Sequence, residues 1–294
     1  MNEDLIPDSP SRTASLLCRI VGSPPLRIVL LGYILLRMMG LNTDVMTSYA
    51  DDPFKSVEHI VALAIAGFAI YLAYACAIER RPVSELALPG MGRELGIGVL
   101  IGAGLYAICE TVLMVFGVYR ITGLNSPALM VPAIAMALSS GVFEELLFRG
   151  VLFRSVETWF GSWADLVVSS LVFGLTHLIN PEATLEGALF IAVEAGVLLA
   201  AAYMLTRRLW LSMGFHVAWN YTQSAIFSSI VSGNEAAQGL IRSTVDGPDF
   251  LTGGKFGLES SILSLVLCTT TGVVMVVMAV KRGRIVPPKW KREA

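Results

Sequence analysis

Charged residues are scarce in this chain of 294 residues, where Asp, Glu, Lys and Arg together make up 15% of the sequence. Soluble domains carry about 25% charged residues, so the low share excludes an ordinary soluble domain. Hydrophobic residues make up 55%, and the run from Ile121 to Phe143 contains no charged residue at all. A run of that length is long enough to cross a bilayer. The composition therefore predicts a polytopic membrane protein.

Cysteine is also rare, and several common site motifs are missing. The four cysteines lie far apart and form no CxxC pair, which argues against a disulfide framework and against a thiolate metal site. No HExxH motif, Gly-rich phosphate loop or internal repeat occurs. Residues 1–25 lack a cationic stretch leading into a short apolar core, so we expect no cleaved signal peptide. We interpret the basic C-terminal tail as a membrane-flanking segment and expect no nucleic-acid partner.

Apolar segments divide the rest of the chain into an all-α bundle of about eight transmembrane helices. They cover roughly 26–46, 57–78, 94–118, 127–150, 163–180, 186–206, 209–231 and 260–280. Arg37 interrupts the first segment, which is expected either to span with Arg37 facing other helices or to lie in the membrane interface. The fourth helix is expected to continue towards Phe160, because no helix breaker occurs between Val151 and Trp159. The connection from 232 to 259 is expected to be a solvated loop rather than a lid.

The distribution of Lys and Arg predicts the orientation of these segments. With the N-terminus inside, 16 of the 21 basic residues fall in inside loops and tails and four fall outside. We therefore expect a multi-pass protein of the cell membrane with both termini cytoplasmic.

Two carboxylates and a guanidinium follow the charge-free run. In a helix, Glu145 and Arg149 lie one turn apart and can pair, whereas Glu144 lies about 100° away around the helix axis. One carboxylate is then anchored and the other is free, which is the asymmetry that general acid–base chemistry needs. Charged groups beside a membrane-spanning segment usually mark function.

Two of the three histidines lie within apolar segments, each four residues from a second polar or aromatic group. His177 follows Phe173 by four residues and His216 precedes Asn220 by four, so each pair shares a helix face. Each pair alone is equally well explained by hydrogen bonding between helices. Together with Glu144 they lie on three helices, and helical bundles build their sites from side chains on facing helices. Glu110 and Glu194 also lie in apolar segments. Each is interpreted either as a proton-relay or secondary site group, or as a structural group that is paired within the bundle.

These residues reproduce three motifs in order: EExxxR at Glu144-Glu145-Leu146-Leu147-Phe148-Arg149, FxxxH from Phe173 to His177, and HxxxN from His216 to Asn220. The chain thereby resembles the CPBP family of intramembrane proteases, which includes the CAAX prenyl endopeptidases and the Abi-type bacteriocin-immunity proteins. The resemblance covers roughly 127–260 and extends to Leu209-Trp210 and to the stretch from Gly253 to Glu259. It implies a protease core at 127–280. Composition and hydropathy predict a polar cytoplasmic segment at 1–25 and transmembrane helices at 26–118 before this core, and a basic cytoplasmic tail at 281–294 after it.

The resemblance also implies roles for single residues. Glu144 would be the general base that activates a water, with help from His177. His216 and Asn220 would donate hydrogen bonds to the oxyanion. Supporting roles fall to Glu145, Arg149 and Phe173, with Arg149 holding Glu145.

The nature of the site leaves two questions open. Glu144, His177 and His216 could bind zinc with a water as the fourth ligand, but we favour a metal-free site. The expected partners are membrane lipid and a membrane-associated, possibly CAAX-like, protein or peptide substrate. The alternative is a non-catalytic membrane protein, either an immunity factor or a transporter-like binding protein. A transporter would more often contain internal repeats.

Overall fold

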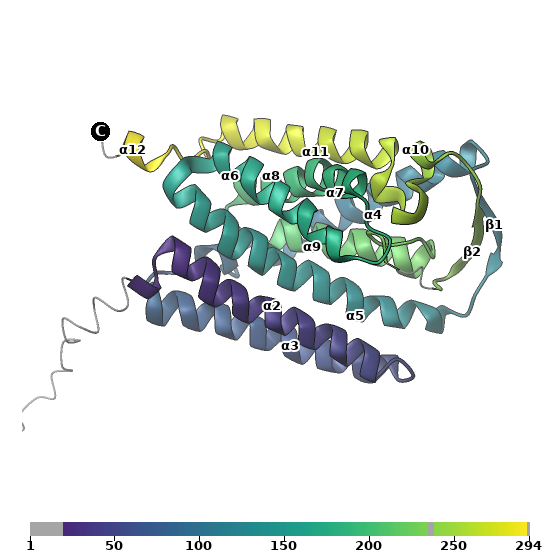
Figure 1. Cartoon of the computed structure of the whole chain (residues 1–294), viewed down its shortest axis with the longest axis horizontal. Coiled ribbons are helices and arrows are strands. Elements are labelled where there is room, and N and C mark those ends of the chain that lie inside the picture. Colours follow the sequence, from purple (N-terminus) through teal and green to yellow (C-terminus); the bar gives the residue numbers. More distant parts are fainter. Residues whose placement is uncertain (1–19, 235–237, 293–294) are drawn as a thin grey trace, which may run out of the picture.

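The computed structural model describes residues 20–234 and 238–292, so most of the predicted polar segment at 1–25 lies outside the described residues. The described chain is a bundle of helices with one pair of short strands at one end (Figure 1). The helices that build the bundle are α2 (Pro24–Ser48), α3 (Pro53–Ala73), α4 (Met91–Val115), α5 (Val131–Ser139), α6 (Arg154–Thr176), α7 (Leu185–Ile191), α8 (Val197–Thr206), α9 (Trp210–Tyr221) and α11 (Ile262–Lys281). The predicted all-α fold class is confirmed.

Several of these helices are extended by π-helical turns, in which the hydrogen bonds run from residue i to i+5. They are η1 (Tyr74–Ile78), η4 (Ser140–Phe153), η6 (Ala192–Gly196) and η7 (Thr222–Ile226). Two short helices, α10 (Asp249–Thr252) and α12 (Lys289–Arg292), complete the set of α-helices. The start of α2 and α12 lie at the same end of the bundle (Figure 1), and the cytoplasmic position of both termini stays a prediction.

Six helices of the described chain are long and apolar enough to cross a membrane: 24–48, 53–78, 91–115, 127–179, 185–206 and 262–281. The predicted number of eight is not confirmed. The predicted segments 127–150 and 163–180 belong to one helical run, and the segment predicted at 209–231 is a 12-residue α9 extended by the five residues of η7. This last helix is short and lies in the interior of the bundle.

The helical run from 127 to 179 turns back on itself at Gly161. The helix that carries Glu144 continues through Phe160, as predicted, and is broken where Gly161 adopts φ 79° and ψ 171°. Positive φ is accessible to glycine at little cost. A Cβ at this position would also lie 2.8 Å from the backbone oxygen of Val286. The break lets the second arm, α6, return along the bundle (Figure 1), and His177 at its end lines the same cavity as Glu144.

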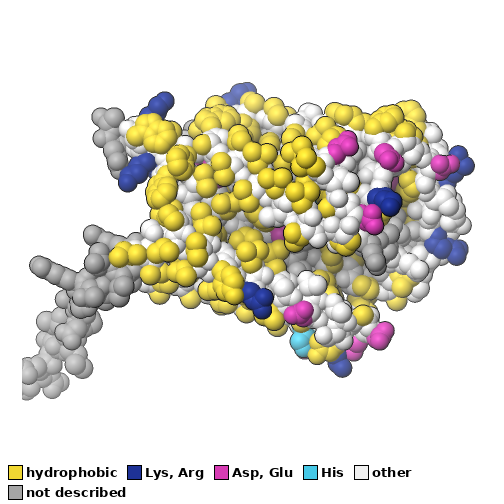
Figure 2. All heavy atoms as spheres, viewed as in Figure 1, with side chains coloured by type: hydrophobic (Ala, Val, Ile, Leu, Met, Phe, Trp, Pro, Cys, Tyr) yellow, Lys and Arg dark blue, Asp and Glu magenta, His cyan; other side chains and the backbone are white. Residues whose placement is uncertain are grey.

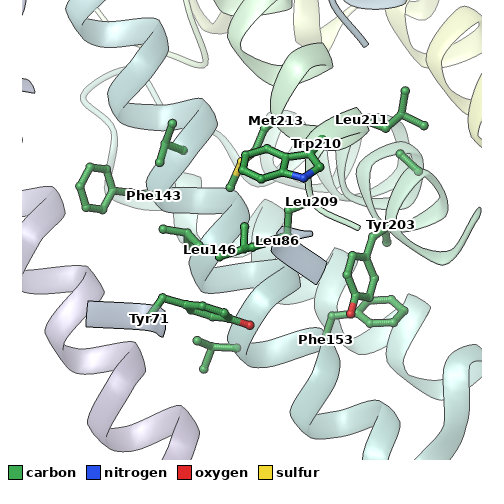
Figure 3. Packing of buried hydrophobic residues seen from close by; sticks show 14 of the residues in the cluster. Tyr71, Leu86, Phe143, Leu146, Phe153, Tyr203, Leu209, Trp210, Leu211 and Met213 are labelled. Atoms are coloured by element: carbon green, nitrogen blue, oxygen red, sulfur yellow. The ribbon is translucent and has the colours of Figure 1, made fainter. Parts of the chain in front are cut away.

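The bundle core forms where the first arm of this run meets α9. Phe143 and Leu146 of η4 belong to the same buried cluster as Trp210 and Met213 of α9 (Figure 3). Gly141 permits the close approach of the two helices, because a Cβ there would lie 2.9 Å from the backbone nitrogen of Val217. The two helices that carry the polar motifs are therefore held in direct contact.

The surface of the bundle is largely apolar, as expected of a protein in lipid. Figure 2 shows hydrophobic side chains over the left and middle of the visible face and acidic side chains gathered towards its right-hand end. Arg37 is exposed on α2, so of the two expected arrangements the one in which Arg37 faces other helices is not found. Since α2 lies at the edge of the bundle, its outward face meets no other helix, and a long arginine side chain can reach towards the membrane interface.

An ion-pair network closes the end of the bundle where α2 begins. Arg81 Nη2 lies 2.6 Å and Arg154 Nη1 lies 3.2 Å from Glu85 Oε1. Burial raises the pKa of Glu85, but Arg154 and Arg81 outweigh burial, so this pKa lies below its usual range. The hydroxyl of Tyr71 donates a further hydrogen bond to Glu85, at 2.6 Å. The network joins α3, the loop after it and the helix that carries Glu144.

Two strands that the sequence analysis did not predict lie at the other end. β1 (Tyr119–Leu124) pairs antiparallel with β2 (Ile241–Val245), with Tyr119 opposite Val245. The second strand lies inside the connection expected to be a loop at 232–259. Each strand is short and its partner is more than 100 residues away in the chain, so periodicity within either segment is a weak signal.

Candidate active site

A cavity of about 640 Å³ opens inside the bundle between α2, η4, α6, η6 and α9. All four residues predicted to be catalytic line it: Glu144, His177, His216 and Asn220. They come from three different helices, and the first and last of them are 76 residues apart in the chain. The supporting residue Phe173 lines the same cavity.

Glu144 is the less constrained of the two adjacent carboxylates. Its Oε2 lies 3.9 Å from His216 Nε2, and its side chain is 15% exposed. The same oxygen has no hydrogen-bond partner among the described residues. A carboxylate that is free, partly exposed and next to an imidazole is well placed to accept a proton from a water in the cavity.

Glu145 is fully buried and orients two other groups. Arg149 Nη1 lies 2.9 Å from Glu145 Oε1, and His216 Nδ1 donates to the same oxygen at 3.0 Å. The sequence analysis assigned Glu145 only to the pair with Arg149 and missed its bond to His216, 71 residues away. Because Nδ1 is engaged by Glu145, the second nitrogen of His216 faces Glu144.

Arg149 is held on three sides although it lies in an apolar interior. Besides the ion pair that its Nη1 forms with Glu145, the Nη2 of Arg149 donates a hydrogen bond to the carbonyl oxygen of Gly196 at 3.3 Å. Its guanidinium carbon lies 4.5 Å from the centre of the Phe173 ring, which adds a cation–π contact. The ring of Phe173 in turn lies 5.0 Å from that of His177 and 6.1 Å from that of His216, between centroids. The ring of Phe173 thus packs against the buried guanidinium and lies beside both imidazoles.

His177 lies where the second arm of the long run ends. Its Nδ1 donates to the carbonyl oxygen of Phe173 at 2.8 Å. Since a carbonyl oxygen can only accept, Nδ1 carries a proton. Its other nitrogen makes no hydrogen bond within the described residues and is available to a ligand in the cavity.

Asn220 is anchored to the helix of Glu144 by a residue that the sequence analysis did not assign to the site. Its Nδ2 donates to the hydroxyl of Ser140 at 2.8 Å. Ser140 precedes Glu144 by four residues, and this spacing was the available signal that the two share a helix face. The second hydrogen of the Asn220 amide remains free for another acceptor.

The helix around Glu144 is π-helical from Ser140 to Phe153, whereas the sequence analysis assumed an α-helix. In a π-turn the backbone hydrogen bonds depart from the regular i to i+4 pattern of an α-helix, and such turns are frequent at functional sites. Both Glu144 and Ser140 lie within this segment, so its wider turns set the direction in which the site residues project.

Further acidic residues differ in their relation to the cavity. Glu110 accepts hydrogen bonds from Tyr106 at 3.0 Å and Ser229 at 2.8 Å and does not line the cavity, which favours a structural role. Glu194 does line it, as does Glu259, which the sequence analysis noted only as part of a family-like stretch. The cavity therefore contains more carboxylates than the three motifs predict.

The described residues do not offer a ready metal site. No group of three His, Cys, Asp or Glu side chains among them lies close enough to hold a metal ion. Glu144, His177 and His216, which would be the ligands of zinc, therefore do not fit a three-residue metal site in this arrangement.

Comparison with known proteins gives one match, at the residues that carry the site. A family model for the Rce1-like type II CAAX prenyl endopeptidases matches residues 126–222, which include all three motifs. No curated protein matches the chain. No solved structure matches it either. The family match supports a peptide hydrolase of the CAAX type, and together with the six apolar helices it supports a multi-pass membrane protein. The match, which covers residues 126–222, supports a CPBP/CAAX protease assignment for this part of the chain.

Proposed function

We propose that this protein hydrolyses a peptide bond of a membrane-associated protein or peptide inside its cavity, with Glu144 as the general base. The observation that supports the proposal most strongly is the convergence of Glu144, His177, His216 and Asn220 on one cavity enclosed by apolar helices. An immunity factor that only binds its target would not need a free carboxylate 3.9 Å from an imidazole.

The proposed reaction begins with a water between Glu144 and His177. Glu144 takes one proton from this water, and the oxygen attacks the carbonyl carbon of the substrate. The C=O bond opens, and the negative charge moves to the oxygen of the tetrahedral intermediate. Glu144 then gives its proton to the leaving nitrogen as the C–N bond breaks, so the carboxylate is regenerated. No proton is left over in this cycle.

The oxyanion would be stabilised by His216 and Asn220. When His216 carries protons on both nitrogens, Nδ1–H donates to Glu145 and Nε2–H can donate to the oxyanion. Asn220 offers the amide hydrogen that Ser140 does not use. Arg149 and Glu145 act as positioning residues, because they set the direction of His216 without lying in the cavity.

The walls of the cavity suit a substrate that is partly lipophilic. Methionines from two helices, Met39 and Met46 of α2 and Met136 of α5, contribute to the lining. Flexible thioether side chains adapt to apolar groups of different shape. A lipid-anchored or membrane-inserted peptide therefore fits better than a soluble one.

Comparison of two membrane proteomes would test this function. Cells that produce the wild-type chain and cells that produce Glu144→Gln are expected to differ in a small set of membrane-associated proteins. These would be shortened or lost only with the wild-type protein, because only it can activate the water. Quantitative mass spectrometry of peptide termini measures the difference. Identical terminal peptides in the two proteomes, at equal amounts of both variants, would favour the non-catalytic immunity factor.

We also propose that the cleavage needs no metal ion. The purified protein is expected to contain less than one equivalent of zinc and to retain its cleavage rate after treatment with a strong chelator. The physical reason is the geometry of the carboxylate and the two imidazoles, which is sufficient for acid–base catalysis but does not supply three grouped ligands. Elemental analysis and the rate before and after chelation are the measurements. Loss of activity on chelation that added zinc restores would contradict the proposal.

A further inference from the structure

Two buried carboxylates that the proposed mechanism does not use line the same cavity. The residue Glu194 is 1% exposed and Glu259 is 4% exposed, and both contribute to the cavity wall. No Lys or Arg among the described residues lines this cavity. With Glu144, three acidic side chains face the cavity, and the basic side chains of the described residues that line it are those of His177 and His216, of which His216 lies next to Glu144.

Glu259 is held in place as an acceptor. Trp219 Nε1 donates to its Oε1 at 3.1 Å, and the backbone nitrogen and the hydroxyl of Ser232 donate to its Oε2 at 2.6 and 2.7 Å. Three donors on two oxygens occupy most of the acceptor capacity of this carboxyl group. Glu259 and Asn220 both line the cavity, so this carboxylate faces the same space as the proposed oxyanion site.

Glu194 contributes an unsatisfied oxygen. Its Oε2 is buried and has no hydrogen-bond partner among the described residues. An unpaired buried oxygen of this kind costs about 1–3 kcal/mol, so a position that retains it is a candidate for binding a donor. Glu194 lies in η6, two residues before Gly196, whose carbonyl oxygen accepts from Arg149. The carboxylate is therefore carried by a segment that is fixed to the catalytic helix.

The rest of the wall around these carboxylates is apolar. Ile191, Leu199 and Phe215 lie in the same lining. A buried charge without a partner is strongly destabilising, whereas a charge of opposite sign with good geometry compensates it. A long alkyl chain that ends in a cation meets both conditions, because its stem packs on apolar side chains and its tip pairs with a carboxylate. A metal ion is a poorer occupant, since no three ligand side chains of the described chain are grouped.

We propose that Glu194 and Glu259 form an acidic subsite that binds a Lys or Arg side chain of the substrate. This inference rests on the proposed function, because it places the subsite in the cavity where cleavage would occur. It narrows the substrate class to membrane-associated peptides with a basic residue close to the cleaved bond. Glu194 and Glu259 come from different segments of the cavity wall and would hold the cationic tip from two sides.

Binding of paired peptides would test the subsite separately from cleavage. The probes are two fluorescent, palmitoylated peptides that differ only in Lys or norleucine at one position, and they are titrated into full-length Glu144→Gln protein in lipid nanodiscs. The Lys peptide is expected to bind at least about tenfold more tightly, which corresponds to about 1.4 kcal/mol. Adding Glu194→Gln or Glu259→Gln is expected to reduce this preference to about threefold or less. Glu186→Gln, an exposed glutamate on α7 that does not line the cavity, is the matched control and should retain the preference.

The outcomes separate the subsite from the proposed function. Equal dissociation constants for the Lys and norleucine peptides, with every position of the basic residue tried, would overturn the subsite. An unchanged Lys preference in both glutamine variants would overturn it as well. If the protein prefers the Lys peptide but the wild-type protein does not cleave it, the proposed function is contradicted, whereas the proposed subsite is supported. If Glu259→Gln does not fold, a competition experiment replaces this variant: n-butylammonium, which is cationic, and n-butanol, which is neutral, each compete with the Lys peptide for binding. Equal inhibition of peptide binding by the two compounds would overturn the subsite.

Discussion

Glu144→Gln is expected to lower kcat/KM for peptide cleavage by about 10²- to 10⁴-fold, which is the usual contribution of a general base. Glutamine has nearly the same size and can still accept a hydrogen bond, but it cannot take a proton from water at neutral pH. The side chain is partly exposed and its Oε2 has no hydrogen-bond partner in the described chain, so the substitution removes no hydrogen bond of this oxygen. Cleavage rates of a substrate identified from the proteome comparison, measured in lipid, give the value.

A measurement of stability shows whether Glu144→Gln loses activity because the general base is missing or because the protein unfolds. The midpoint of thermal unfolding of Glu144→Gln is expected to stay within a few degrees of the wild type, because the fully buried neighbour Glu145 keeps its bonds to Arg149 and His216. Glu186→Gln controls for the removal of one negative charge elsewhere. Full cleavage activity in Glu144→Gln would exclude Glu144 as the base.

Arg149→Met is expected to reduce the free energy of unfolding by about 3–5 kcal/mol, the range for removing one partner of a buried ion pair. The guanidinium and the carboxylate of Glu145 are 1% and 0% exposed. Methionine would fill the space but leave Glu145 paired only with His216 and the carbonyl oxygen of Gly196 without its donor. Chemical unfolding of the protein in mixed micelles, followed by tryptophan fluorescence, measures the change.

A double variant tests whether the charge of Glu145 causes this loss. Arg149→Met combined with Glu145→Gln is expected to be more stable than Arg149→Met alone, because the uncompensated charge is removed. Surface ion pairs contribute about 0–1 kcal/mol, so Lys255→Met, which breaks the exposed pair with Glu182 at 3.6 Å, is the matched control. A loss of less than about 1 kcal/mol in Arg149→Met would show that the buried pair is not a determinant of stability.

Local sequence was sufficient to predict the features that depend on composition and short spacing. Long apolar segments predicted a helical membrane protein because a span must satisfy all of its backbone hydrogen bonds internally. The absence of a breaker between Val151 and Trp159 predicted that the helix continues to Phe160, and it does. The four-residue spacing of Glu145 and Arg149 placed them within reach of each other. Three motifs in order also predicted the family, which the match at residues 126–222 supports.

Contacts between distant segments required the tertiary structure, because no local pattern records which faces of two helices meet. The bond from His216 to Glu145 depends on the approach of η4 and α9 at Gly141, and the outward direction of Arg37 depends on the position of α2 at the edge of the bundle. The pairing of β1 with β2 and the arrival of Glu259 in the cavity likewise join segments far apart in the chain. Sequence alone thus determined which groups are present and on which helices they lie. Packing of small residues at helix crossings decided which of those groups share a cavity, since only close backbone approach brings their side chains within hydrogen-bonding distance.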